Sequence, residues 1–162
     1  IELLDIGCGV GNNSMFFAQQ GFNVFAYDSS TSAINILKKN LKFYKNFHAR
    51  TLNFSEMKNY YNSNFFDLIC DCTSLQHDEV NTYYDNLKVV FSKLKKNGIF
   101  IGKFLFKNKN MNPKNLFLNK ISKFKLKNNL NYYSKNEIQI STISSENLIN
   151  YSKYYLIYGE KK

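Results

Sequence analysis

The chain is poor in several residue types whose abundance would point to particular classes of protein. Its 162 residues include one proline, one arginine and three cysteines, and they include no tryptophan. The three cysteines, Cys8, Cys70 and Cys72, are odd in number and do not predict a disulfide framework. Reduced thiols are typical of the cytosol, so we expect a cytoplasmic location.

Metal-binding and membrane-spanning patterns are also missing. The spacing of Cys70 and Cys72 lacks the second ligand pair that a structural zinc site needs, so we expect no metal. No apolar run reaches the roughly 20 residues of a membrane helix, so we expect no membrane partner. Because there is no internal repeat and 44% of the residues are hydrophobic, residues 1–162 are expected to form one domain.

The formal charge of +10 comes almost entirely from lysine, since Arg50 is the only arginine. Such a charge favours an anionic partner such as nucleic acid. However, the guanidinium fork reads phosphates and bases better than an ammonium does, and the sequence also shows the Asn, Tyr, Ile and Phe enrichment of AT-rich codon usage. A solvated lysine surface is therefore favoured over a nucleic-acid partner.

What the chain does have is an apolar run that leads into a glycine-rich turn. Residues 1–6 predict a strand buried on both faces. Glycines then occupy every second position, namely Gly7, Gly9 and Gly11. They allow a tight turn and the close approach of a ligand, and a helix over 12–20 that stops at Gly21 follows. Residues 22–27 predict a second strand, which Asp28 follows.

This order of elements is typical of a nucleotide-type cofactor site at the head of an open α/β sheet. Asp28 lies 17 residues after Gly11, near the distance at which an acid accepts hydrogen bonds from a ribose diol. The helix after the turn presents its positive end to the same space. An ordinary strand-to-helix turn remains the alternative.

The string Asp5-Ile6-Gly7-Cys8-Gly9-Val10-Gly11 resembles motif I of the class I S-adenosylmethionine-dependent methyltransferases. An acid two residues before the first glycine suits a cofactor that carries an ammonium and a sulfonium. It would repel a pyrophosphate.

The resemblance covers nearly the whole chain. It includes a fourth strand at 65–72, an L-x-H-like segment at 74–77, a helix end with a fifth strand at 94–101, and a last strand at 154–159. Asn97 takes the place of a common glycine, and asparagine tolerates the left-handed conformation expected there. The resemblance implies an α/β fold with a Rossmann-like, seven-stranded, mostly parallel sheet, helices on both faces and an antiparallel last strand.

Further elements are expected from periodicity and caps. These are helices over 30–45 and 79–95, strands over 48–54 and 98–106, and a strand or short helix over 136–143. Residues 107–135 contain Pro113, and they are interpreted as a substrate cap or a surface insertion. Family members usually carry helices before the first strand, so we expect an N-terminal segment to be missing from this chain.

The resemblance also implies the residues of the site. Asp5 and the glycines would cradle the amino-acid end of the cofactor, Asp28 the ribose, and Asn53 and Phe54 the adenine, where Asn53 replaces an acid. The candidate cofactor-binding residues are Asp5, Gly7, Cys8, Gly9, Gly11, Asp28, Ser29, Asn53, Phe54, Asp71 and Cys72. Asn53 and Phe54 could equally be ordinary strand-end residues.

The implied reaction is methyl transfer from S-adenosyl-L-methionine, which leaves S-adenosyl-L-homocysteine. His77 is the candidate general base, because its ordinary pKa of about 6.5 suits proton removal near neutral pH. A helix-start or packing role for His77, or a base supplied by Asp71 or a tyrosine, remains open. An amine acceptor could also need no strong base.

The acceptor itself is not readable from these motifs. A compact domain with little arginine favours a small molecule. The alternatives are an RNA or protein acceptor held by the lysine-rich 107–135 segment, or a non-catalytic relative that binds the cofactor alone. The oligomeric state has no sequence signal.

Overall fold

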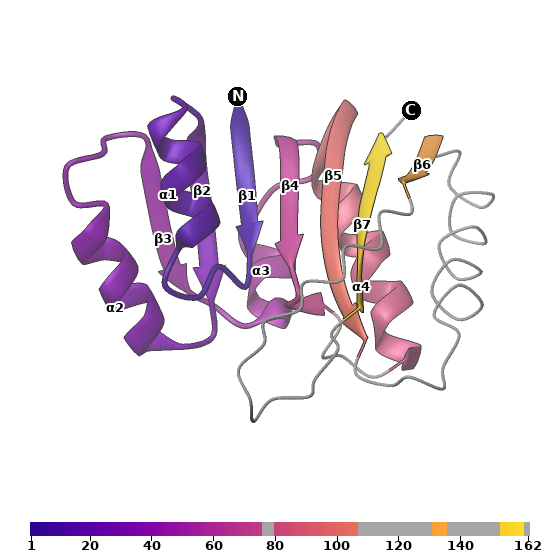
Figure 1. Cartoon of the computed structure of the whole chain (residues 1–162), viewed down its shortest axis with the longest axis horizontal. Coiled ribbons are helices and arrows are strands. Elements are labelled where there is room, and N and C mark those ends of the chain that lie inside the picture. The colour runs from indigo at the N-terminus through magenta and orange to yellow at the C-terminus, as the bar shows by residue number, and fades with distance from the viewer. Residues whose placement is uncertain (76–79, 107–130, 136–152, 161–162) are drawn as a thin grey trace.

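The structure is a computed structural model that describes residues 1–75, 80–106, 131–135 and 153–160. Strands and helices alternate along its first hundred residues (Figure 1). The elements in chain order are β1 Glu2–Ile6, α1 Asn12–Gln19, β2 Asn23–Asp28, α2 Thr31–Asn40, β3 Phe47–Thr51, α3 Phe54–Tyr60, β4 Phe66–Cys72, α4 Val80–Lys93, β5 Leu94–Phe106, β6 Asn131–Lys135 and β7 Lys153–Glu160.

The strands form one seven-stranded sheet in the order β3-β2-β1-β4-β5-β7-β6. The first five strands in the chain pair in parallel, whereas β7 runs antiparallel to both β5 and β6. The predicted mostly parallel sheet with an antiparallel last strand is therefore confirmed. Because β1 lies between β2 and β4, the chain reverses its direction of travel across the sheet at β1, where ligands of such folds bind.

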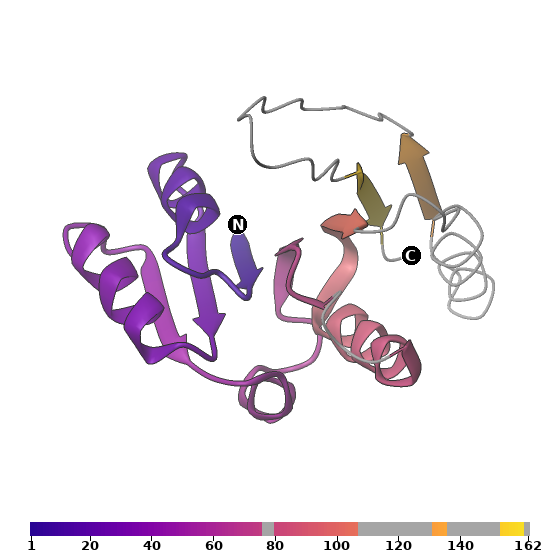
Figure 2. The ribbon, with the colours of Figure 1, turned by 60° about the horizontal axis from the view of Figure 1, so that its bottom comes forward.

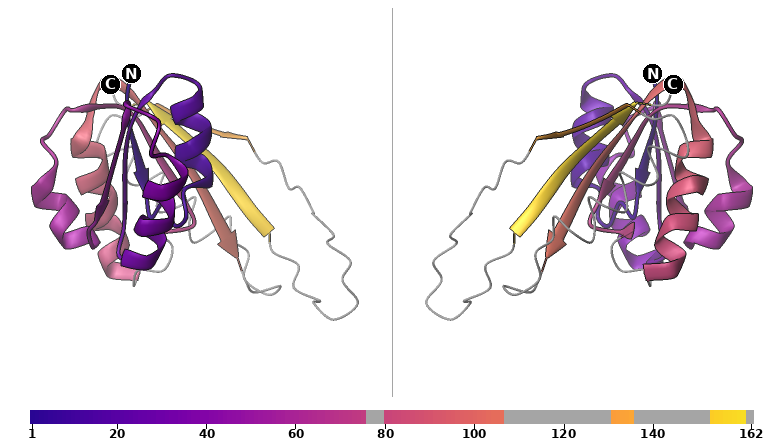
Figure 3. Two further views of the ribbon diagram at one scale, coloured as in Figure 1. Left: turned by 90° about the vertical axis from the view of Figure 1, so that its left-hand side faces the viewer. Right: turned by 90° about the vertical axis from the view of Figure 1, so that its right-hand side faces the viewer.

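Two apolar layers pack against opposite faces of this sheet. Leu3 and Leu4 are adjacent in β1, and their side chains point to opposite faces because successive residues of a strand alternate. The layer that includes Leu3 contains residues of α1 and α2, and the layer that includes Leu4 contains residues of α3 and α4. Figures 2 and 3 show the two pairs of helices on either side of the strands, as predicted.

Helix α2 is shorter than the periodicity predicts. It begins after Ser30, whose hydroxyl accepts a hydrogen bond from the Ala33 amide and so caps the helix. It ends at Asn40 rather than at residue 45. The chain turns at Leu41, where the Tyr44 amide donates to the Leu41 carbonyl and both side chains pack toward the sheet. Burial of these two side chains favours the turn over continuation of the helix.

Strand β5 begins earlier than predicted, at Leu94 instead of residue 98, and α4 correspondingly ends at Lys93. Asn97 has a φ of 64°, which confirms the expected left-handed residue. Its neighbour Gly98 has no room for a side chain, since a Cβ would lie 2.9 Å from the Lys95 carbonyl oxygen. The register between β4 and β5 shifts at this point.

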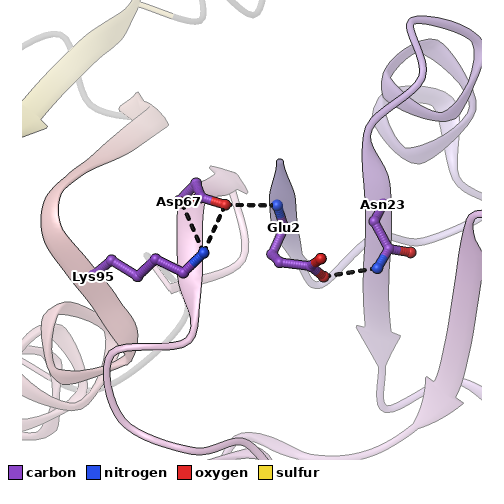
Figure 4. A network of polar contacts seen from close by, with 4 residues as sticks. All are labelled: Glu2, Asn23, Asp67 and Lys95. Atoms are coloured by element: carbon purple, nitrogen blue, oxygen red, sulfur yellow. Dashed lines mark hydrogen bonds and ion pairs between the residues drawn. The ribbon is translucent and has the colours of Figure 1, made fainter.

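A polar network joins the strands at the end of the sheet where β1 begins (Figure 4). The Lys95 ammonium lies 2.9 Å from an Asp67 carboxylate oxygen, and the other oxygen accepts the Glu2 amide at 2.8 Å. The Glu2 carboxylate in turn accepts from the Asn23 side-chain amide at 2.7 Å. These contacts tie together β1, β2, β4 and β5 at the end of β1 remote from its carboxyl end.

Several expectations lie outside the described residues. These are the strand or helix over 136–143 and most of the 107–135 segment, of which only β6 is described. None of the helices in the described ranges has the length and apolar character of a membrane span. The predicted last strand is confirmed by β7.

Candidate functional site

The site is built where the carboxyl ends of β1, β2 and β4 lie side by side. Ile6, the last residue of β1, pairs with Tyr27 of β2 and with Asp71 of β4. The glycine loop therefore begins between the strand ends that carry Asp28 and Asp71. The topology thus brings together the glycine loop, Asp28 and Asp71, which the sequence predicts as parts of one site.

The loop depends on the conformational freedom of its glycines. Gly7, Gly9 and Gly11 all have positive φ, at 59°, 54° and 91°. A Cβ on Gly7 would lie 2.1 Å from the Ser74 hydroxyl oxygen, and one on Gly11 would lie 1.9 Å from Leu37 Cδ1. A Cβ on Gly9 would meet no atom within 4 Å. Gly7 and Gly11 are thus required by packing, whereas Gly9 faces open space at the centre of the loop.

Asp28 holds this loop in place. One carboxylate oxygen accepts the Gly9 amide at 2.9 Å, and the other accepts the Ser30 amide at 2.8 Å. Each oxygen keeps a lone pair for a further donor. Asp28 is half-buried and Ser29 is exposed, so this acid remains within reach of a ligand beside the loop.

Asp5 lies beneath the loop and is almost completely buried, at 1% exposure. Its Oδ2 accepts the Ser14 hydroxyl at 2.6 Å, and its Oδ1 has no partner among the described residues. Burial raises the pKa of this carboxyl to about 6, although the Ser14 hydrogen bonds lower it and the nearby Asp28 raises it slightly. A cation near Asp5 would favour the ionised carboxylate, and it would so offset the cost of burial and the repulsion by Asp28.

Ser14 was not identified from the sequence. It is fully buried on α1, where it orients the Asp5 carboxylate. A signal does exist in the sequence, because a small hydroxyl residue three positions after the last loop glycine lies on the helix turn nearest to the strand. That position indicates a role only once the loop geometry is known.

The prediction that Asn53 and Phe54 end the third strand is wrong. Strand β3 ends at Thr51, and Asn53 caps α3, of which Phe54 is the first residue. The Asn53 side-chain oxygen accepts the Glu56 amide at 2.9 Å, and the Glu56 carboxylate accepts the Asn53 amide at 2.8 Å. This capping box explains why helix begins here. The side-chain oxygen retains one lone pair, so an adenine contact stays a prediction.

Asp71 has a structural task at the end of β4. Its Oδ1 accepts the Ser74 amide at 3.0 Å and the Leu75 amide at 3.3 Å. These bonds shape the turn in which Thr73 has a φ of 70°. Asp71 is buried at 1% exposure, while its neighbour Cys72 is half-buried.

Two cysteines of the loop and of β4, Cys8 and Cys70, carry thiols that are not activated. Burial raises the pKa of Cys8, and the Asp5 and Asp28 carboxylates raise it further. Burial also raises the pKa of Cys70. A neutral thiol is a poor nucleophile and a poor metal ligand, so Cys8 serves as a small apolar group in the loop.

Two further expectations receive no structural support. His77, the candidate base, lies outside the described residues. Across the described ranges, no three His, Cys, Asp or Glu side chains come together as metal ligands would. The expectations of a histidine base and of no metal both stay predictions.

The chain belongs to a methyltransferase family, because residues 1–147 match the model of a methyltransferase domain. The wider resemblance to the class I S-adenosylmethionine-dependent methyltransferases is confirmed by this match and by the strand order. No curated protein sequence matches the chain. The family implies S-adenosylmethionine as the cofactor.

Solved structures share the fold at low sequence identity. A methyltransferase from Methanosarcina mazei is 15% identical with a TM-score of 0.72, and the match covers 99% of this chain and 92% of that one. One from Archaeoglobus fulgidus is 15% identical with a TM-score of 0.67, covering 99% and 86%. The [4+2]-cyclase SpnF is 12% identical with a TM-score of 0.73, covering 99% and 75%.

The residues of the site fit this cofactor. The unpartnered Asp5 oxygen is an acceptor for the positive charge of an ammonium group, directly or through water. Gly9 leaves open space beside the Asp28 carboxylate, which can accept a hydroxyl. Two acids and no arginine or lysine in the loop would suit a cationic ligand and oppose a pyrophosphate.

Proposed function

We propose that this protein transfers a methyl group from S-adenosylmethionine to a small-molecule acceptor. The observation that carries the proposal is the buried Asp5 carboxylate, which has one oxygen without a partner under an open glycine loop. An uncompensated buried acid costs stability, and such a cost is typical of a site that binds a cation.

The residues of the chain would act mainly by holding the cofactor in position. Asp5, oriented by Ser14, would accept the ammonium end, and Asp28 would accept the ribose hydroxyls while it fixes Gly9. Phe54 and Asn53, at the start of α3, would contact the adenine. When bound, S-adenosylmethionine supplies an already activated methyl group, so positioning and exclusion of water provide most of the catalysis.

A general base would be needed only where the acceptor must lose a proton. His77 is our candidate, since it follows β4, whose carboxyl end faces the site. Asp71 is a poorer candidate than the sequence alone suggests, because its carboxylate already accepts the Ser74 and Leu75 amides.

A small acceptor is favoured over RNA or protein by composition. The chain has one arginine, and the tetrapeptide after Cys70, Asp71-Cys72-Thr73-Ser74, is unlike the N-P-P-Y type that suggests methylation of a planar amine. An RNA acceptor predicts binding that weakens steeply with salt. Binding that is unchanged between low and moderate salt would exclude it.

Calorimetric titration of S-adenosylmethionine and S-adenosylhomocysteine tests the cofactor site. The variant Asp28→Ala should lose at least about ten-fold in affinity, because charge-assisted hydrogen bonds are lost and the loop is released. Asp67→Ala is the matched control, since Asp67 also accepts a backbone amide on this sheet but lies at the other end of the strands. Equal affinities of Asp28→Ala and wild type would contradict the proposal.

Transfer of an isotope-labelled methyl group then tests the reaction. Label should appear on a compound from a mixture of small metabolites and not on total RNA or protein. Tight cofactor binding with no transfer to any of the three would instead support a non-catalytic relative, or another reaction on the same fold as in the cyclase neighbour.

A further inference from the structure

Strand β3 forms one edge of the sheet, and among the described residues its only partner strand is β2 (Figure 1). The pairing with β2 runs without a shift of register over all five residues, Phe47–Thr51, so the strand has no bulge. The strand also contains no proline. Prolines and bulges are devices by which proteins close an edge against a further strand. Since β3 has neither, the geometry of its outer side permits the addition of a strand.

The hydrogen bonds between β2 and β3 determine which groups of β3 face outward. The Val24 amide donates to the Asn46 carbonyl at 2.9 Å at one end of this ladder, and the Leu52 amide donates to the Asp28 carbonyl at 3.0 Å at the other. In a parallel pair, a strand bonds to its neighbour at every second residue, so the positions between those residues are directed away from β2. The three outward residues of β3 are Phe47, Ala49 and Thr51.

A hollow of about 420 Å³ accompanies this edge. It is lined by the four consecutive residues Phe47 to Arg50, and by residues at the end of α2 and in the turn that follows α2. Successive side chains of a strand point to opposite faces of the sheet. Because residues at both odd and even positions line the hollow, it follows the edge of the strand and is not confined to one face. The hollow therefore offers space beside β3 for an extended chain.

Cations lie on both faces of this edge. Lys38 and Lys42 line the hollow on the face that α2 covers. Arg50 belongs to the other face, where its guanidinium lies over the Tyr60 ring of α3, with 4.6 Å from Cζ to the ring centroid. All three cations are exposed, and within the described residues none of them forms an ion pair with a carboxylate. A compact anion cannot contact both faces, whereas an extended peptide can, because its side chains alternate between the same two faces.

The charge of the edge also determines which kind of strand fits. Between residues 29 and 55 the sequence has four lysines, one arginine and no acid. A second copy of this chain would bring the same cations to the edge, and like charges on paired strands are destabilising. A strand rich in aspartate and glutamate would instead find an opposite charge on either face. The edge therefore disfavours self-pairing and favours an acidic partner.

We propose that the outer edge of β3 binds an extended acidic peptide of a partner protein by strand addition. The backbone of the peptide bonds to the three outward residues of β3, and its acidic side chains meet Lys38 and Lys42 on one face and Arg50 on the other. The proposed cofactor site lies instead at the carboxyl ends of β1, β2 and β4. The inference therefore goes beyond the proposed function and does not depend on it.

Amide hydrogen exchange of the full chain, followed by NMR, tests the backbone contacts. The probe is the capped peptide acetyl-Ile-Glu-Glu-Val-Glu-Glu-Ile-amide, in which neighbouring glutamates point to opposite faces of a strand. Saturation with the peptide should slow exchange at the Phe47, Ala49 and Thr51 amides by at least about ten-fold. The His48 and Arg50 amides face β2 and should change less. Unchanged exchange at the three outward amides would overturn the proposal, as would absence of peptide binding.

Two further peptides, methylated on alternate amide nitrogens, separate strand addition from attraction between charges. Each carries the charge of the parent peptide, but the methyl groups remove the donors along only one edge of the peptide strand. In calorimetric titration one of the two should lose at least about ten-fold in affinity, and the other should bind like the parent. Equal affinities of the two methylated peptides would show that the backbone of the peptide does not pair with β3, and the proposal would be wrong.

Protein variants test the cations on each face. The double variant Lys38→Ala/Lys42→Ala and the single variant Arg50→Gln should each weaken binding of the parent peptide by about three-fold or more, as exposed ion pairs do. The matched control Lys39→Ala/Lys45→Ala removes the same charge from the same stretch of chain, but neither lysine lines the hollow. It should change the affinity by less than about two-fold, because general surface charge is screened by salt. Equal weakening by the two double variants would contradict the proposal.

A nucleic-acid probe separates the two classes of anionic partner. A short oligouridylate with the same charge as the peptide should leave exchange at the outward amides unchanged, because phosphates lack the alternating donors and acceptors of a peptide strand. Protection by the oligouridylate equal to that by the peptide would overturn a peptide as the occupant. Asp28→Ala should retain peptide binding, so that a failure of the cofactor site and a failure of the edge are distinguishable.

Discussion

Two carboxylates on neighbouring strands, Asp5 and Asp28, have different tasks because their burial and their hydrogen-bond partners differ. Asp28 is half-buried and holds the loop through two backbone amides, whereas Asp5 is buried and holds only the Ser14 hydroxyl. Both oxygens of Asp28 therefore have a partner within the fold. One oxygen of Asp5 has none among the described residues.

Asp5 should make the free protein less stable as the pH rises. Its folded pKa is about 6, above the ordinary value of 3.8, so the folded state holds the proton more tightly than the unfolded state does. Stability is therefore highest below about pH 4 with respect to this group, and on the order of 3 kcal/mol is lost by the time the pH exceeds 6.

Urea denaturation between pH 4 and pH 7 would measure this loss. Asp5→Asn keeps an acceptor for Ser14 but cannot ionise, so its stability should change less over the same range. Asp5→Leu is unsuitable as a comparison, because it would also remove the Ser14 partner. Parallel pH profiles for wild type and Asp5→Asn would contradict a raised pKa.

Gly9→Ala should weaken cofactor binding more than folding. A Cβ at Gly9 meets no protein atom within 4 Å, so the cost to stability comes only from its φ of 54° and should be about 1 kcal/mol. The same Cβ enters the open space where the cofactor would lie. Calorimetry should therefore show at least about a ten-fold loss of S-adenosylmethionine affinity.

Gly21→Ala is the control for this prediction. Gly21 also has a positive φ, 85°, and open space around it, but it follows α1 at the end remote from the loop. It should match Gly9→Ala in stability and leave the affinity unchanged. Equal affinities of the two variants would show that the loop is not approached by the cofactor.

At the scale of whole elements, caps and turns decide where helices begin and end. The capping box of Asn53 and Glu56 starts α3 immediately after β3. At the other end of α3, the buried Lys93 ammonium donates to the Lys58 carbonyl at 2.8 Å and to the Tyr61 carbonyl at 2.6 Å. Helix α3 is thus bound at both ends by polar contacts, one of which comes from α4.

Asn53→Ala should lower the free energy of unfolding by about 1 kcal/mol, because the N-cap is lost. If Asn53 also contacts the adenine, cofactor affinity should fall too, whereas Asn53→Asp should retain the cap and bind at least as tightly. Glu56→Ala serves as control, since it removes the other half of the capping box. Loss of affinity in Glu56→Ala equal to that in Asn53→Ala would assign the whole effect to the cap.

Across the whole molecule, the two ends of the sheet have different tasks. One end forms the candidate binding site, and the other carries a polar network that joins the strands. The carboxyl ends carry the glycine loop and Asp28, and the other end carries the network of Glu2, Asn23, Asp67 and Lys95 (Figure 4). Opposite ends of a sheet are separated by the length of its strands, so changes at one end should have little effect at the other.

Lys95→Gln tests this division. Asp67 and Lys95 are each more than a third exposed, so loss of their ion pair should cost less than about 1 kcal/mol. S-adenosylmethionine affinity should not change. A large loss of affinity in Lys95→Gln, measured by calorimetry, would show that the two ends are coupled.

The class of fold and the centre of the site follow from patterns within short stretches of the sequence. The alternation of apolar runs with capped helices, together with Asp5, the three glycines and Asp28, is a local pattern, and local patterns survive without tertiary information. The seven-stranded, mostly parallel sheet with an antiparallel last strand followed from the family resemblance, and the strand pairing confirms it.

The roles of particular side chains depend instead on the tertiary structure, in which distant parts of the chain come into contact. The burial of Asp5, the partnership with Ser14, the cap at Asn53 and the structural bonds of Asp71 depend on which surfaces meet, and no sequence spacing assigns them until that geometry is known. Long-range contact sets burial and partners, and these set charge states and the space left for ligands.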